Sequence, residues 1–122
     1  MKVELEKRLI AFSVDIIDLS KLLEYNVAAR NLSFQIVKSS TSSALNYGEA
    51  QSAESRKDFV HKISIVVKEL KETQINLEII KRAHLSKAYN KQEKLMRECQ
   101  ELIAIFTKTI QTAKKNMLET KK

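Results

Sequence analysis

The histidines and acidic residues are the first candidates for chemistry. His61 and His84 are the two histidines of the sequence, and Cys99 is its single cysteine. Asp58 and His61 have an Asp-x-x-His spacing, which on a helix brings both side chains to one face, as in the Glu-x-x-His motifs of bundle di-metal sites. Such sites need two of these motifs, and the sequence has no second copy. One glycine also excludes a glycine-rich phosphate loop. We therefore expect no metal, no cofactor, no catalytic residue and no enzymatic activity.

Polar and aromatic side chains are densest between residues 46 and 62. One interpretation is a contact between subunits, because Tyr and Arg are effective interface anchors. A second is an RNA-facing surface, in which Tyr47 stacks on a base and basic side chains contact phosphates. A third is a corner that only caps its own helices. The candidate residues for the oligomer interface are Asn46, Tyr47, Glu49, Glu54, Ser55, Arg56, Asp58 and His61.

The formal net charge is +7 and the pI is about 9.5. A basic balance of this size favours a polyanionic partner such as RNA or DNA. The alternative is a solvated surface, since lysines are scattered along the sequence and often neighbour glutamates. The candidate nucleic-acid contacts are Arg56, Lys57, Lys62, Lys81 and Arg82.

The elements that would position these residues are helices. Proline is absent and glycine occurs once, at Gly48, so folds with many tight turns are unfavourable. Apolar residues alternate at spacings of four and three over residues 2–23, which predicts a bundle helix. A second helix is expected over residues 27–50, with Asn26 as its N-cap. The hydroxyl-rich residues 39–43 are expected to continue this helix, because small side chains let two backbones approach closely.

Two further helices follow from the same periodicity. Ser52 and Ser55, the latter followed by Asp58 in a capping-box-like pairing, are both candidate N-caps of the third helix. Its apolar stripe runs from Phe59 and is predicted to reach His84. Asn90 is expected to begin the fourth helix, whose core stripe comprises Leu95, Cys99, Leu102, Phe106, Ile110, Ala113 and Met117. Short connections make sequential helices antiparallel, so we predict an all-α, up-down-up-down four-helix bundle that forms a single domain over residues 1–122.

The sequence also bears on the cellular compartment. A lone cysteine forms no internal disulfide and suits a reducing environment. Charges interrupt every apolar run near the start, and no run approaches the roughly 20 residues of a membrane span. We therefore expect a cytoplasmic protein with no membrane association.

Residues 39–80, SSTSSALNYGEAQSAESRKDFVHKISIVVKELKETQINLEII, resemble a known family. It comprises the four-helix-bundle proteins encoded within bacterial 23S rRNA intervening sequences, which also occur as free-standing bacterial genes. Weaker similarity extends over most of the chain, and the sequence departs from the pattern at residues 74–76, where relatives usually carry bulkier aromatic residues. The residues that carry the resemblance are Asn46, Tyr47, Glu49, Ala50, Ala53, Glu54, Ser55, Asp58, Phe59 and the run from Glu69 to Thr73.

The resemblance implies an antiparallel bundle that assembles as a ring, with a homopentamer favoured, and no enzymatic activity. It also implies kinship with accessory proteins of diversity-generating retroelements, which are basic pentameric bundles that bind nucleic acid and a reverse transcriptase. Our leading hypothesis is a homo-oligomeric bundle that binds RNA or DNA through a basic surface. The alternative is a scaffold for a protein partner, such as a reverse transcriptase, with no role in nucleic-acid binding.

Overall fold

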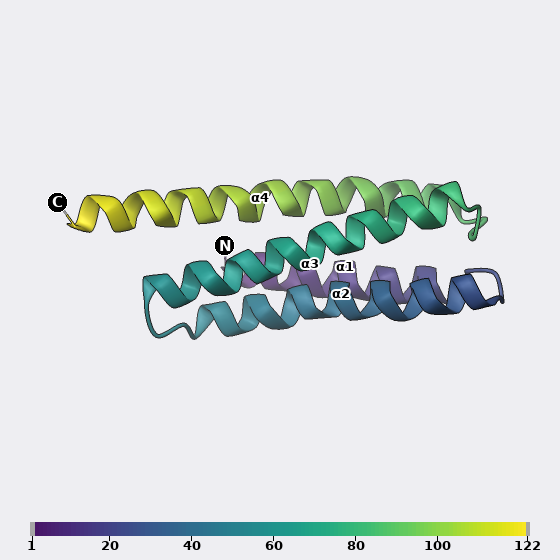
Figure 1. Ribbon diagram of the computed structural model, residues 1–122, viewed down its shortest axis with the longest axis horizontal. Coiled ribbons are helices and arrows are strands. Elements are labelled where there is room, and N and C mark those ends of the chain that lie inside the picture. Colours follow the sequence, from purple (N-terminus) through teal and green to yellow (C-terminus); the bar gives the residue numbers. More distant parts are fainter. Residues whose placement is uncertain (1, 122) are drawn as a thin grey trace.

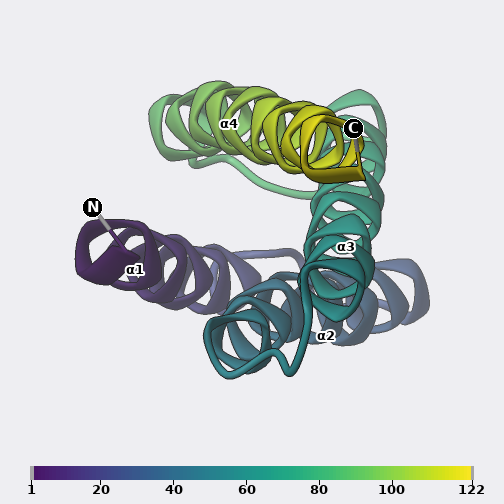
Figure 2. The same cartoon turned by 90° about the vertical axis from the view of Figure 1, so that its left-hand side faces the viewer.

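The computed structural model describes residues 2–121 and contains four α-helices. They are α1 (Lys2–Ser20), α2 (Val27–Gln51), α3 (Arg56–Arg82) and α4 (Tyr89–Lys121). The helices run alternately in opposite directions along one axis (Figure 1). Each helix packs against the next, and α4 closes the bundle against α1; within residues 2–121 the backbones of the diagonal pairs do not approach each other closely. The predicted antiparallel four-helix bundle is confirmed, and α2 and α4 lie on opposite sides of it (Figure 2).

The core receives apolar side chains from all four helices. Tyr47 on α2 packs against Phe106 on α4, with ring centroids 5.3 Å apart and the planes tilted by 59°. This tilted arrangement is one that aromatic pairs prefer, because it brings a ring edge towards a ring face. The largest fully buried side chains are Leu9, Phe12, Ile16, Leu19, Ile36, Ile63, Val66, Leu70, Leu77, Ile80, Leu102 and Phe106.

Two of the predicted helix caps are confirmed. The Asn26 side chain accepts a hydrogen bond from the Ala29 amide at 2.8 Å. Ser55 Oγ accepts one from the Asp58 amide at 3.0 Å. Each cap satisfies an amide that has no partner within its helix. The fourth helix instead begins one residue before the expected position, at Tyr89, so Asn90 lies inside the helix.

The end of α1 corrects the predicted boundary. α1 ends at Ser20 rather than at residue 23. Leu23 forms an isolated antiparallel bridge with Ser86, and the Glu24 amide donates to the Leu85 carbonyl at 2.8 Å. The α1–α2 and α3–α4 connections are therefore joined at the same end of the bundle. Their mutual hydrogen bond satisfies backbone groups that would otherwise be paired within a further turn of α1.

The end of α3 corrects the predicted role of His84. Its φ of 54° is left-handed, and the side chain is exposed rather than part of the core stripe. The His84 amide donates to the Lys81 carbonyl at 3.2 Å, and the Leu85 amide donates to the Ile80 carbonyl at 3.1 Å. These two bonds form a Schellman cap, whose left-handed position is usually glycine. The helix therefore stops here because the backbone reverses its twist.

The hydroxyl-rich segment continues α2 as predicted. Ser39, Ser40 and Ser43 are buried. Ser43 Oγ donates to the Ser40 carbonyl at 2.6 Å, and Ser13 on α1 donates to the same carbonyl at 3.1 Å. Bonds to the preceding turn satisfy these hydroxyls without larger side chains. The segment thereby lets α2 pack closely against its neighbours.

Candidate nucleic-acid interface

The five basic residues selected from the sequence do not form one patch. Lys57 lies at the start of α3 and Lys81 near its end, a separation of about 36 Å at 1.5 Å per residue. Three of the five form ion pairs: Lys62 with Glu49 at 2.9 Å, Lys81 with Glu93 at 2.8 Å and Arg82 with Glu78 at 3.2 Å. Arg56 Nη1 donates to the Asn116 carbonyl at 3.4 Å. Most of these five basic residues therefore make polar contacts within their own subunit.

Tyr47 does not have the expected surface position. Its side chain is only 3% exposed, inside the core of its own subunit. Burial, followed by the charge of Glu6, raises the pKa of the Tyr47 hydroxyl. A ring in this position is not available to stack on a base, so the interpretation of Tyr47 as a surface contact is corrected.

The other residues of the corner mainly hold the α2–α3 connection. Asn46 Nδ2 donates to the Ser42 carbonyl at 2.9 Å. Asp58 accepts a long bond of 3.4 Å from the Glu54 amide, and Ser55 caps α3. His61 is exposed on the outer side of α3. These contacts are those of a corner that caps its own helices.

A second basic feature lies on α4. Lys94, Lys108 and Lys115 recur at intervals of seven residues or a multiple of seven, and Glu101 occupies the remaining position; Lys87, one repeat earlier, lies in the connection before α4. Seven residues make nearly two helical turns, so the four positions on α4 share one face. All five are exposed, whereas the buried positions of α4 lie on its opposite side. We call Lys94, Arg97, Lys108 and Lys115 the α4 basic stripe.

The acidic residues near this stripe are already paired. Glu93 pairs with Lys81 at 2.8 Å. Arg8 on α1 binds both oxygens of Glu98 at 2.7 Å and also Glu101 at 3.0 Å. Hydrogen bonding to these carboxylates raises the pKa of the Arg8 guanidinium. These carboxylates are bound by cations of other helices and form no ion pair with the stripe within residues 2–121.

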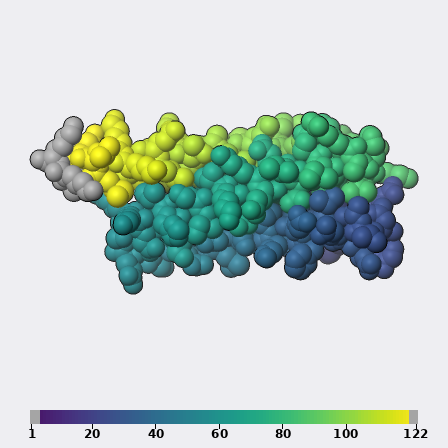
Figure 3. All heavy atoms as spheres, in the orientation of Figure 1, coloured from purple at the N-terminus to yellow at the C-terminus, as the bar shows by residue number. Residues whose placement is uncertain are grey.

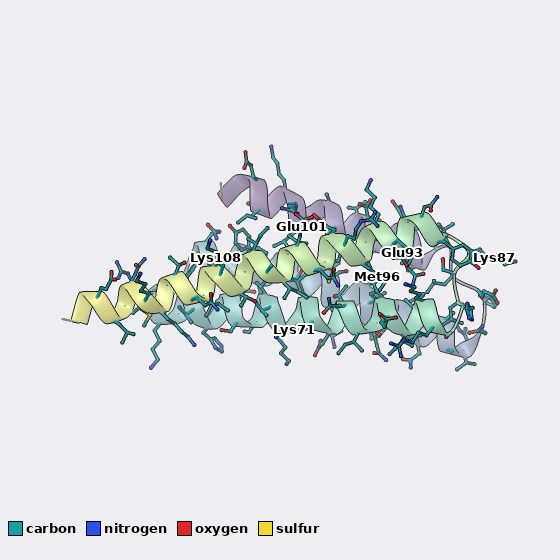
Figure 4. All side chains as sticks on the ribbon, turned by 90° about the horizontal axis from the view of Figure 1, so that it is seen from above. Lys71, Lys87, Glu93, Met96, Glu101 and Lys108 are labelled. Carbon is teal, nitrogen blue, oxygen red and sulfur yellow. The ribbon has the colours of Figure 1, made fainter. Side chains whose placement is uncertain are left out.

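The stripe presents free cations along one line. Within residues 2–121, none of its four members forms an ion pair. Lys94 and Lys115 are separated by about 32 Å along the helix axis. Viewed from above, Glu101 and Lys108 lie along α4, Lys87 lies at the connection before this helix, and Lys71 lies on the neighbouring α3 (Figure 4). The sequence reasoning missed this stripe, although the seven-residue lysine repeat was a visible signal.

The opposite side of the bundle exposes apolar side chains. On α2, Phe34 is 71% exposed and Leu45 is 67% exposed. Four further exposed apolar residues lie on the two helices that flank α2: Ile10 and Val14 on α1, and Ile75 and Ile79 on α3. We call these six residues the apolar back face. α2 lies across the bundle from α4, with α1 and α3 between them (Figure 2).

Residues 2–121 contain no cluster of three or more potential metal ligands. Their helices also lack an apolar stretch that would cross a bilayer.

The fold and these surfaces define an all-α bundle protein with one basic and one apolar side. Residues 1–108 match the family described as 23S rRNA-intervening sequence protein, and the chain belongs to this family. The chain is also similar to a solved protein of unknown function from the S23 ribosomal protein family of Bacteroides thetaiotaomicron. The two are 30% identical with a TM-score of 0.76, over 87% of this chain and 97% of that one. No curated protein matches the chain.

Proposed function

We propose that this protein is a non-enzymatic, homo-oligomeric, cytoplasmic helical bundle that binds RNA through the α4 basic stripe. The observation that carries the proposal is the line of cations on α4 that form no ion pair within residues 2–121, beside carboxylates that are bound by Lys81 and Arg8 instead. Lysine and arginine contacts to phosphates release condensed counterions, which is the main source of sequence-independent affinity. A rigid helix that holds these cations in line would bind a phosphate backbone without reading base edges.

The family supports RNA as the nucleic acid. Its description refers to 23S rRNA intervening sequences, and a structured RNA is a polyanion of the kind that a basic stripe suits. None of the four residues of the stripe is aromatic, and Tyr89, which is 63% exposed, lies at the start of α4. We therefore expect recognition of RNA shape and charge, with little dependence on base sequence.

Self-association would use the apolar back face. Six exposed apolar residues spread over three helices exceed the single exposed leucines that an ordinary surface carries. Assembly through this side would leave the stripe on α4 accessible. The ring of five that the family resemblance implies is the stoichiometry that we propose. In a ring, each copy would add its own stripe, so that RNA affinity would rise by multivalent contact.

The alternative function is a scaffold for a protein partner. A groove of about 540 Å³ between α2 and α3 favours it, because the groove is bordered by exposed Ile75 and Ile79 as well as by Lys38, Glu69 and Glu72. A mixed apolar and charged groove suits a helical peptide. This function predicts capture of one specific protein and no response to RNA.

Light scattering with and without structured RNA separates the two functions. At low salt, we expect a discrete oligomer whose mass increases with RNA, and at high salt the RNA should dissociate while the oligomer persists. An oligomer that ignores RNA at low salt would contradict RNA binding and favour the scaffold. A monomer that binds RNA would contradict the proposed self-association but not the proposed RNA binding.

A further inference from the structure

The end of the bundle that carries the N-terminus of α1 contains an open cavity. The C-terminal part of α4 runs past the start of α1 and past the turn between α2 and α3 (Figures 1 and 3). The cavity between the helices measures about 460 Å³. This size lies within the range of small-molecule sites, roughly 300–1,000 Å³. All four helices contribute to its lining, through Leu5, Tyr47, Gln51, Phe59, Ile105, Phe106 and Thr109, with Glu4 and Arg8 at its edge.

The lining is apolar with one unsatisfied polar atom. Three aromatic rings, those of Tyr47, Phe59 and Phe106, contribute to it. Gln51 Oε1 is buried and has no hydrogen-bond partner within residues 2–121. A buried acceptor without a donor is costly, and native proteins rarely leave one in place. The terminal torsion of a glutamine is soft, so a small rotation would turn this oxygen towards a ligand in the cavity.

The charges around the cavity are predominantly negative. Glu4 is exposed at its edge. Arg8 is held by two carboxylates, Glu98 and Glu101, so this group carries a net negative charge. Glu6 adds to the negative potential at Tyr47. A ligand with a positive group at the mouth of the cavity would therefore be favoured, even though the whole protein is basic.

We propose that this cavity binds a small aromatic amine. The planar ring would lie between the aromatic side chains, an N–H of the ligand would donate to Gln51 Oε1, and the ammonium group would face Glu4. The cavity shares Phe59, Ile105 and Thr109 with a shallower groove of about 510 Å³ that continues along α4 past Lys108. The positive charge of Lys108 directs the ammonium group to the opposite edge, where Glu4 lies.

The chain has no tryptophan, so the fluorescence of an indole ligand can be measured without background from that residue. Tryptamine is the main probe. We expect saturable binding with a blue-shifted emission, and about tenfold weaker binding of indole-3-propionate, which has the same ring and the opposite charge. 1-Methyltryptamine, which lacks the ring N–H, should bind roughly threefold to tenfold more weakly than tryptamine.

Three variants of the full chain assign these effects to residues. In Gln51→Met, tryptamine and 1-methyltryptamine should bind equally, because the acceptor is gone. In Glu4→Gln, the advantage of tryptamine over indole-3-propionate should shrink. Glu24→Gln, a matched loss of one charge at the other end of the bundle, should bind like the wild type. The proposal is overturned if tryptamine binding does not saturate, or if N-methylation weakens binding to Gln51→Met as much as binding to the wild type. It is also overturned if Glu4→Gln and Glu24→Gln bind the ligands alike.

Discussion

Ser39 Oγ on α2 and Thr73 Oγ1 on α3 lie 2.6 Å apart in the core. Each hydroxyl also lies within hydrogen-bond distance of a carbonyl of its own helix, that of Ile36 at 3.3 Å and that of Glu69 at 2.9 Å. One hydroxyl therefore donates to the other while the second donates to its own backbone, which leaves no buried hydroxyl without a partner. This pair marks the closest polar contact between α2 and α3, and it depends on small side chains.

The contact predicts an unequal effect of two substitutions at Ser39. Ser39→Leu should lower the free energy of unfolding by about 2–3 kcal/mol, because a large side chain overpacks the helix contact. Ser39→Ala should cost about 1 kcal/mol, through the lost hydrogen bond. Urea unfolding followed by circular dichroism measures both. A Ser39→Leu variant as stable as the wild type would contradict the close packing of α2 and α3.

The left-handed conformation of His84 predicts a stabilising substitution. His84→Gly should raise the free energy of unfolding by about 0.5–1 kcal/mol, because glycine adopts a φ of 54° without steric cost. His84→Val should lower it by about 1 kcal/mol or more, since a β-branched side chain is strained there. Thermal unfolding of the three proteins checks the order. Equal stability of the glycine and valine variants would show that the Schellman cap does not form.

The buried thiol of Cys99 predicts a dependence of stability on pH. Burial, followed by the charge of Glu98, raises the pKa of the thiol to about 12, and Sγ donates to the Leu70 carbonyl at 3.2 Å. Between about pH 9 and pH 12 the folded protein keeps this proton while the unfolded chain loses it, so stability falls as pH rises. Relative to Cys99→Ala, the wild type should lose roughly 1 kcal/mol per pH unit in this window.

The lysines and tyrosines are present in both the wild type and Cys99→Ala, so their contribution to the pH dependence cancels in the difference between the two stabilities. Urea unfolding at a series of pH values gives the difference directly. Two stability curves that remain parallel up to pH 12 would mean that the thiol is accessible to solvent.

The proposed self-association through the apolar back face predicts that the oligomer depends on one exposed leucine and not on another. Leu45 on α2 is 67% exposed, and Leu118 near the end of α4 is 65% exposed. Leu45→Asp should dissociate the oligomer while the subunit stays helical, because an interface core does not accept an unpaired charge. Leu118→Asp is the matched control and should retain the wild-type mass in light scattering. The reverse result would place the interface on α4.

The architecture was predictable because local signals agreed with the packing. Asn26 and Ser55 are capping residues at positions where the apolar periodicity restarts, and both caps form. The serines of residues 39–43 could be placed in a helix because the flanking periodicity continues through them. The end of α1 could not be placed, because Leu23 fits the apolar spacing but pairs with Ser86, a partner distant in the sequence.

The site was less predictable, because it depends on partners that are distant in the sequence. The burial of Tyr47 depends on where Phe106 packs, and the neutralisation of Lys81 depends on Glu93 in the next helix. A sequence shows that a side chain is charged, but it does not show which side chain from another helix pairs with it. The α4 basic stripe could have been found, since Lys94, Lys108 and Lys115 share a heptad position that the core stripe does not use.

The most direct test of the proposed function compares two triple variants with the same change of charge. One is Lys94→Gln/Lys108→Gln/Lys115→Gln on the stripe. The other is Lys7→Gln/Lys21→Gln/Lys38→Gln, three exposed lysines away from α4. The measurement is the affinity for a structured RNA as a function of salt concentration, with wild-type protein alongside.

The stripe variant should bind RNA much more weakly at low salt, and the slope of log K against log salt should become shallower by about 2–3 per subunit in contact. The control variant should keep both the affinity and the slope close to those of the wild type. Equal losses in the two variants would mean that the net charge alone governs binding, and this result would contradict the assignment of the RNA-binding surface to α4.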